Sequence, residues 1–106
     1  MAFEIILAPE AIEDLRRLSA RDRATVRTAL EVHLRHEPTK LSRSRIKRLR
    51  GLARPQYRLR VDDLRVFYDV GIGEVHVLAI VAKDQADAWL AECGEFDDEG
   101  PIEPDR

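Results

Sequence analysis

Residues 57–70, YRLRVDDLRVFYDV, constrain the fold more than any other part of the chain. Apolar and charged residues alternate on both sides of Asp62 and Asp63, which is the pattern of two strands joined by a two-residue turn. With that turn, Arg60 faces Arg65, although like charges that face each other across a strand pair are destabilising. We therefore expect this face to serve a polyanionic ligand, which would offset the repulsion.

The alternation divides the hairpin into two faces with different chemistry. One face is apolar and is expected to pack under helices; it comprises Tyr57, Leu59, Val61, Leu64, Val66 and Tyr68. The other face is expected to stay open, and it comprises Arg58, Arg60, Arg65 and Phe67. Guanidinium groups bind phosphates and an aromatic ring stacks on bases, so this face is predicted to bind nucleic acid, with RNA as the favoured ligand.

The charged residues are segregated along the sequence. Between Lys40 and Arg65 there are ten lysines or arginines and two acids, whereas the other 80 residues hold eight basic and eighteen acidic side chains. This separation predicts a positive patch on an acidic body. The segment before the hairpin is expected to extend the patch with Lys47, Arg48 and Arg50. The alternative is that carboxylates of the last helix or of the C-terminal tail pair with the arginines.

The residues before the basic segment predict one strand and two helices. Residues 3–7 (FEIIL) are a short apolar run with β-branched members, as in a strand. Pro9 suits the first turn of a helix, and Ser19, followed three residues later by Asp22, is expected to cap a second helix over residues 20–36. The apolar residues of the first helix recur at helical spacing; they are Ile12, Leu15 and Leu18.

The segment that joins the helices to the hairpin is the least regular part of the chain. Residues 39–55 read TKLSRSRIKRLRGLARP and are interpreted as an ordered basic loop. Within it, Ile46 and Leu49 are expected to anchor a helical turn, which Gly51 ends.

The residues after the hairpin predict one more strand and a short helix. Residues 74–82 (EVHVLAIVA) are apolar on both faces, as in a central strand, and Asp84 is expected to cap a helix that ends near Glu92. This order predicts an α+β fold, in which an N-terminal strand and a two-helix hairpin pack on a mainly antiparallel four-stranded sheet with a short C-terminal helix. We expect residues 1–92 to form this domain and residues 93–106 to form a disordered acidic tail.

Length and composition narrow the class of protein. The chain of 106 residues suffices for one domain, and 44% hydrophobic with 36% charged residues indicate a soluble globular protein. No apolar run approaches the roughly 20 residues that span a bilayer. The N-terminus also lacks a basic leader followed by a long apolar segment, so we expect neither membrane insertion nor a signal peptide.

Cysteine and histidine usage indicates a reducing compartment and no metal site. Cys93 is the only cysteine, which excludes a disulfide within the chain and makes the cytoplasm the expected location. The three histidines are not at metal-ligand spacing with one another or with the cysteine, so we expect no metal and no other cofactor.

Several segments together resemble the RelE/ParE family of bacterial toxins from type II toxin–antitoxin systems, with the RelE-like members favoured. They are the opening strand followed by APEAIEDLRRL, the basic KRLRGL, the hairpin YRLRVDDLRVFYDV and the apolar EVHVLAIVA, and they span roughly residues 3–90. The resemblance implies a small α/β fold with two N-terminal helices packed on an antiparallel sheet.

The resemblance also implies one of two activities. RelE-like toxins are endoribonucleases that cut mRNA in the ribosomal A site without a metal, by attack of the ribose 2′-hydroxyl on the adjacent phosphate. ParE-like toxins inhibit DNA gyrase and are not enzymes, and a degenerate toxin retained as an antitoxin-binding module is a third reading. The implied partners are a cognate antitoxin, the ribosome, mRNA and, through the antitoxin complex only, operator DNA; no membrane partner is implied.

Carried over position by position, the resemblance implies phosphate-binding catalytic roles for Arg58, Arg60 and Arg65, with Arg65 at the scissile phosphate. Where RelE-like nucleases have an arginine or histidine after the last strand and then a tyrosine, this chain has Gln85 and Trp89. Lys83 is the only base there and is the candidate proton donor, whereas Trp89 is expected either to stack on a base or to lie in the core. The expected RNA-binding residues are Lys47, Arg48, Arg50, Phe67 and Trp89.

Overall fold

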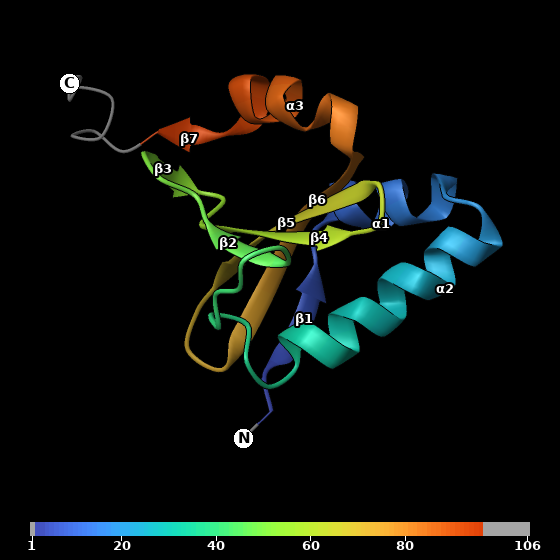
Figure 1. Cartoon of the computed structure of the whole chain (residues 1–106), viewed down its shortest axis with the longest axis horizontal. Helices are drawn as coiled ribbons and strands as arrows, with labels where there is room; N and C mark the ends of the chain where they lie inside the picture. The colour runs from blue at the N-terminus through green and yellow to red at the C-terminus, as the bar shows by residue number, and fades with distance from the viewer. Residues whose placement is uncertain (1, 97–106) are drawn as a thin grey trace.

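The sheet that contains the hairpin has five strands, in the order β1-β6-β5-β4-β2 (Figure 1). In this computed structural model, which describes residues 2–96, the strands are β1 (Glu4–Leu7), β2 (Ile46–Arg48), β4 (Tyr57–Val61), β5 (Leu64–Val70) and β6 (Glu74–Ala82). β1 is parallel to β6, and the other neighbours are antiparallel. A separate two-stranded ribbon pairs β3 (Leu52–Arg54) with β7 (Glu95–Phe96).

Helices lie on both faces of this sheet (Figure 1). On one face, α1 (Pro9–Arg17) and α2 (Ala20–Ala29) form a helical hairpin, and α2 continues as the short π-helix η1 (Leu30–Leu34). After β6, the 3-10 turn η2 (Lys83–Gln85) leads into α3 (Ala86–Cys93), which covers part of the opposite face. Within residues 2–96, no helix combines the length and the apolar character that crossing a bilayer requires.

The predicted starts of the first two helices are confirmed. Pro9 opens α1, and the Ser19 hydroxyl accepts a hydrogen bond of 3.1 Å from the backbone N–H of Asp22 at the start of α2. The guanidinium of Arg23 then donates to the backbone oxygens of Leu15 and Leu18, at 3.3 and 3.0 Å. The oxygen of Leu15 also accepts a hydrogen bond from the backbone N–H of Leu18. The bonds from Arg23 thus reinforce the carbonyl groups at the end of α1, which stabilises the short connection.

The main core lies between the helical hairpin and the sheet, and its fully buried side chains include Val26, Leu34, Leu59, Val66, Tyr68, Val75 and Val77. The Tyr68 hydroxyl donates to the backbone oxygen of Pro38 at 2.7 Å, and burial raises the pKa of this tyrosine. Ile12, which the sequence places in the buried stripe of α1, is 39% exposed, and Ala11 is fully buried instead. Both residues stand at helical spacing from Leu15, so the apolar pattern alone does not separate them.

A smaller apolar cluster lies on the other face of the sheet, under α3. Phe67 and Ala79 are cross-strand partners and are both fully buried, and Trp89 of α3 stacks on the Phe67 ring. The expectation that this face stays open is therefore wrong at Phe67, because α3 folds back over it.

Residues 39–55 contain two strands and not the predicted loop with a helical turn. Ile46 of β2 pairs with Leu59 and is buried in the main core, which adds a fifth strand to the four that the sequence predicts. Gly51, predicted to end a helical turn, lies in the connection between β2 and β3 with a φ of 76°. Glycine adopts this left-handed conformation without steric cost, so the residue permits a tight turn.

The C-terminal region differs from the prediction in two places. Asp84 does not cap α3, because the N-cap is Gln85 and no side chain there accepts a capping hydrogen bond. Of the predicted disordered tail, Cys93 ends α3 and Glu95–Phe96 form β7, whereas residues 97–106 lie outside the described part of the chain. The predicted α+β class, with a mainly antiparallel sheet and a short C-terminal helix, is confirmed.

Candidate functional site

The β4–β5 hairpin has the register predicted from its sequence. Arg60 pairs with Arg65, and Arg58 pairs with Phe67. On the other side of β4, Lys47 of β2 pairs with Arg58. The three predicted arginines therefore lie on the sheet face opposite the main core, and Lys47 lies beside them. We call these four side chains, Lys47, Arg58, Arg60 and Arg65, the basic face.

Arg58 is the most confined member of the basic face. Its side chain is half-buried, and its Nε atom is buried without a hydrogen-bond partner among residues 2–96. Burial, followed by the positive charges of Arg65 and Arg60, holds the pKa of this guanidinium below its usual value. An unsatisfied donor of a charged group is costly when it is buried.

Arg60 and Arg65 differ in how firmly they are held. One terminal nitrogen of Arg65 donates to the backbone oxygens of Asp62 and Leu64, at 3.0 and 2.9 Å, so this guanidinium is fixed against the hairpin turn. Arg60 is exposed and lines a surface hollow of about 310 Å³ together with Ser44, Arg45 and Asp62. None of the ion pairs formed among residues 2–96 includes a member of the basic face.

Lys83 lies at the end of β6, beside the turn of the hairpin. Its backbone N–H donates to the backbone oxygen of Asp63 at 2.8 Å, and its Nζ atom is 3.7 Å from a carboxylate oxygen of the same residue. Lys83 is thus placed near the tip of the hairpin, next to an acid. Gln85, two residues along, is exposed in η2.

The aromatic rings of Phe67 and Trp89 stack on each other. Their ring centroids are 5.0 Å apart and their planes differ by 5°. The Trp89 indole also donates to a carboxylate oxygen of Glu10 at 2.8 Å, which connects α3 to the start of α1. The predicted role of Phe67 as an open stacking platform is contradicted by its complete burial, and the reading of Trp89 as a packing residue agrees with both contacts.

The basic segment before the hairpin is divided between the two faces of the sheet. Lys47 is exposed beside Arg58, as described above, whereas Arg48 pairs with Tyr57 and its guanidinium lies 5.3 Å from the centre of that ring. Arg48 also donates to the backbone oxygens of Leu49 and Gln56, at 3.0 and 2.9 Å. It therefore holds the β2–β3 connection. Arg50 is exposed in the turn that follows.

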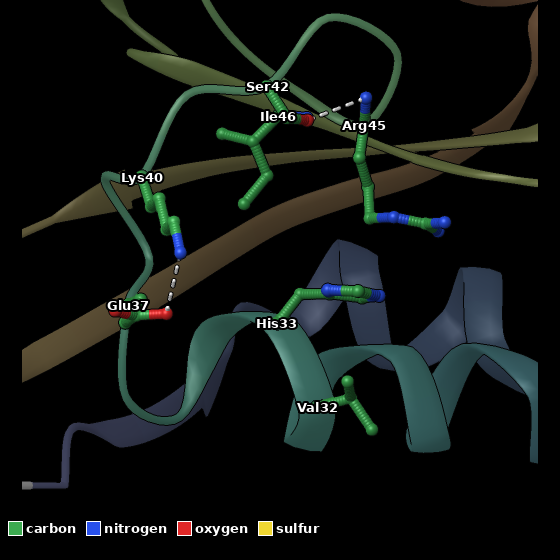
Figure 2. A pocket seen from close by; sticks show the side chains of 7 residues that line it. All are labelled: Val32, His33, Glu37, Lys40, Ser42, Arg45 and Ile46. Atoms are coloured by element: carbon green, nitrogen blue, oxygen red, sulfur yellow. Dashed lines mark hydrogen bonds and ion pairs between the residues drawn. The ribbon is translucent and has the colours of Figure 1, made fainter.

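A second feature, which the sequence patterns did not single out, is a hollow between η1 and the segment that leads into β2 (Figure 2). It has a volume of about 230 Å³. Its lining residues are Val32, His33, Glu37, Lys40, Ser42, Arg45 and Ile46. Burial and the nearby charge of Arg45 lower the pKa of His33. An adjoining hollow of about 400 Å³ extends along α2 to Val61 and Asp62. The one sequence feature that points to these hollows is the run of basic residues that includes Arg45.

Among residues 2–96, no three His, Cys, Asp or Glu side chains come together in an arrangement that could hold a metal ion.

The fold matches solved structures of RelE toxins in complexes. The archaeal RelE–RelB complex from Pyrococcus horikoshii OT3 matches with a TM-score of 0.65 and 20% identity, over 78% of this chain and 97% of that chain. The RelBE2 toxin–antitoxin complex from Mycobacterium tuberculosis matches with a TM-score of 0.61 and 21% identity, over 77% and 99%. The RelB–RelE antitoxin–toxin complex from Methanococcus jannaschii gives a TM-score of 0.54 and 17% identity, over 79% and 96%.

These likenesses establish the architecture. No family model matches the sequence, and no curated protein matches it. The protein has the fold of RelE toxins, and the fold that the sequence resemblance implied is confirmed.

Proposed function

We propose that this protein is the toxin of a type II toxin–antitoxin system and that it inhibits translation by ribosome-dependent, metal-independent cleavage of mRNA. The observation that carries the proposal is the basic face, in which three guanidiniums stand on two paired strands. Like charges at such spacing destabilise the isolated protein, and Arg58 adds a buried donor without a partner. A bound phosphodiester would offset the repulsion between the guanidinium groups.

The chemistry follows from where charge develops. Attack of the ribose 2′-oxygen, whose proton passes to water, on the adjacent phosphorus forms one P–O bond and breaks the bond to the 5′-oxygen, leaving a 2′,3′-cyclic phosphate and a 5′-hydroxyl. Negative charge grows on the nonbridging oxygens during this step, and fixed cations stabilise it. We assign Arg65 to the scissile phosphate, because its bonds to two backbone oxygens hold it in place before the substrate arrives. Arg58 and Arg60 supply the neighbouring charge.

Lys83 is the proton donor that we propose for the leaving 5′-oxygen. Its ammonium carries transferable protons, which a guanidinium gives up poorly. The Nζ atom of Lys83 lies 3.7 Å from a carboxylate oxygen of Asp63. This role therefore requires the lysine to leave that ion pair and contact the substrate.

A second function, inhibition of DNA gyrase in the manner of ParE-like toxins, is favoured by the residues around α3. Trp89, at the position of the tyrosine in RelE-like nucleases, is committed to Phe67 and Glu10, and Gln85 carries no charge. The third reading, a degenerate toxin kept as an antitoxin-binding module, has the same support. In both cases the basic face would bind a partner without cleaving it.

The proposed partner for control is a cognate antitoxin, since the similar structures are complexes of RelE with RelB. The two hollows beside α2 and η1 are the surface that we propose for it. Val32, which lines both hollows, is 64% exposed, and His33 and Arg45 line the same two hollows. An amphipathic antitoxin segment with acidic residues would fit this mixture of apolar and basic groups. We propose that operator DNA is bound only through that complex.

Incorporation of labelled precursors after induction tests the proposal. Early loss of amino-acid incorporation, with thymidine incorporation continuing, is the expected result for translation inhibition. Early loss of thymidine incorporation instead would assign the protein to gyrase. Normal incorporation of both precursors by cells that accumulate folded protein, with no antitoxin present, would assign it to the third reading.

A further inference from the structure

We propose that the acidic residues 97–106 bind the basic face of their own chain and compete with RNA for it. The inference rests on the proposed function, because it concerns regulation of the same site.

The first support is an imbalance of charge. Residues 97–106 hold five acidic side chains and one arginine, whereas the rest of the chain carries a net charge of +2. None of the carboxylates within residues 2–96 forms an ion pair with Lys47, Arg58, Arg60 or Arg65. A carboxylate satisfies a guanidinium with the same bidentate geometry as a phosphate, so an acidic peptide and an RNA backbone are competing ligands for this face.

The second support is the side of the sheet from which the acidic segment leaves. The described chain ends in β7, which pairs with β3 directly after α3 (Figure 1). α3 lies on the face that displays the arginines, because its Trp89 stacks on Phe67 and Phe67 is the cross-strand partner of Arg58. The helix that precedes β7 therefore lies on the same side of the sheet as the basic face.

The third support is reach. Ten extended residues span at most about 33–36 Å, and Phe96, the last described residue, pairs with Leu52, which is only six residues from Arg58 along the chain. A tether of this length keeps the carboxylates at an effective concentration on the order of millimolar. Such an interaction is mainly electrostatic, so added salt weakens it.

The test compares two variants with the same change in net charge. The first removes three of the five acidic charges of the segment by Asp97→Asn, Asp98→Asn and Glu99→Gln. The control carries Glu13→Gln, Asp22→Asn and Glu31→Gln, which lie on the helices of the opposite face. Two readouts are taken on the full chain: the Nε–Hε NMR signals of the arginines without RNA, and fluorescence anisotropy with a labelled single-stranded RNA of about twelve nucleotides.

We expect the first variant to shift the Nε–Hε signals of Arg58, Arg60 and Arg65, and to bind RNA about fivefold or more tightly than the parent at low salt. The control should leave those signals in place and change affinity by less than about twofold. The gain should vanish near 0.5 M salt, where the Debye length is only about 4 Å.

The outcomes separate the two proposals. Unchanged arginine signals with equal RNA affinity in the parent and the first variant would overturn the inference while leaving RNA binding intact. An equal gain in the control would also overturn it, because net charge alone would then explain the effect. Shifted signals without RNA binding by any variant would uphold the intramolecular contact and contradict the proposed function.

Discussion

The indole of Trp89 lies flat on the ring of Phe67, with centroids 5.0 Å apart and planes within 5° of each other. Phe67 is the cross-strand partner of Arg58, so this stack is the border between the apolar cluster under α3 and the basic face. The same indole donates to Glu10. Two contacts thus fix α3 next to the site, and the hydrogen bond can be removed without the stack.

Trp89→Ala should destabilise the protein by about 2–3 kcal/mol, because it uncovers the Phe67 ring and removes the bond to Glu10. Trp89→Phe keeps the stack and loses only the hydrogen bond to an exposed carboxylate, so its cost should be about 1 kcal/mol or less. Urea unfolding followed by far-UV circular dichroism measures both. Equal losses in the two variants would show that the stack contributes little.

Arg58→Met should stabilise the protein by about 1 kcal/mol while abolishing RNA binding. The substitution removes a buried donor without a partner and relieves repulsion from Arg60 and Arg65. Arg60→Met, at an exposed position on the same strand, is the matched control and should change stability by less than about 0.5 kcal/mol. Denaturant midpoints and RNA titrations supply both quantities, and a destabilised Arg58→Met protein would contradict the account of this residue.

The free energy of unfolding should decrease as the pH rises through the folded-state pKa of Asp14. Burial raises that pKa above the ordinary value, although the carboxylate accepts a hydrogen bond of 2.9 Å from the backbone N–H of Ile80. The neutral carboxyl is therefore favoured by folding. The stabilisation is complete at a pH below the unfolded-state pKa and is lost above the folded-state pKa.

Asp14→Asn keeps an acceptor for Ile80 and should remove this dependence, so its stability relative to the parent should increase between about pH 3 and pH 7. Asp14→Ala, which leaves the N–H of Ile80 without a partner, should instead cost about 1–3 kcal/mol. Unfolding curves across the pH range distinguish the two variants. A constant difference between Asn and Asp would show that this carboxyl does not titrate differently in the folded protein.

Tyr68→Phe should cost about 1–2 kcal/mol, since it leaves the buried backbone oxygen of Pro38 without its hydroxyl donor. Tyr57→Phe is the control, because Tyr57 is only half-buried and its stacking on Tyr68 is retained. Thermal unfolding of the two variants measures the difference. Similar melting temperatures would indicate that water replaces the lost hydroxyl at Pro38.

The hairpin could be predicted from the sequence because its signal is local. Alternation around Asp62 and Asp63 sets both the register and the division between faces, so the pairing of Arg60 with Arg65 follows without tertiary information. The helix start at Ser19 is likewise encoded within a few residues.

The structure differs from the prediction where contacts between residues far apart in the sequence determine the local structure. β2 is only three residues long, and two of them are charged, so its pairing depends on burial of Ile46 against the core. The coverage of Phe67 depends on where α3 returns to the sheet, which no pattern within α3 indicates. Arg45 joins His33 because a loop brings them together, and such proximity has no periodic signature in the sequence.

The measurement that tests the central claim most directly is primer extension on cellular mRNAs after induction of the wild-type chain and of Arg65→Ala. The account predicts new cuts within translated codons and growth arrest with the wild type, and neither with the folded variant. Arg16→Ala, on the opposite face and in an exposed pair with Glu13, should cut as the wild type does. Intact mRNA during arrest, or cuts that persist in folded Arg65→Ala, would contradict the assignment of the basic face as a nuclease site.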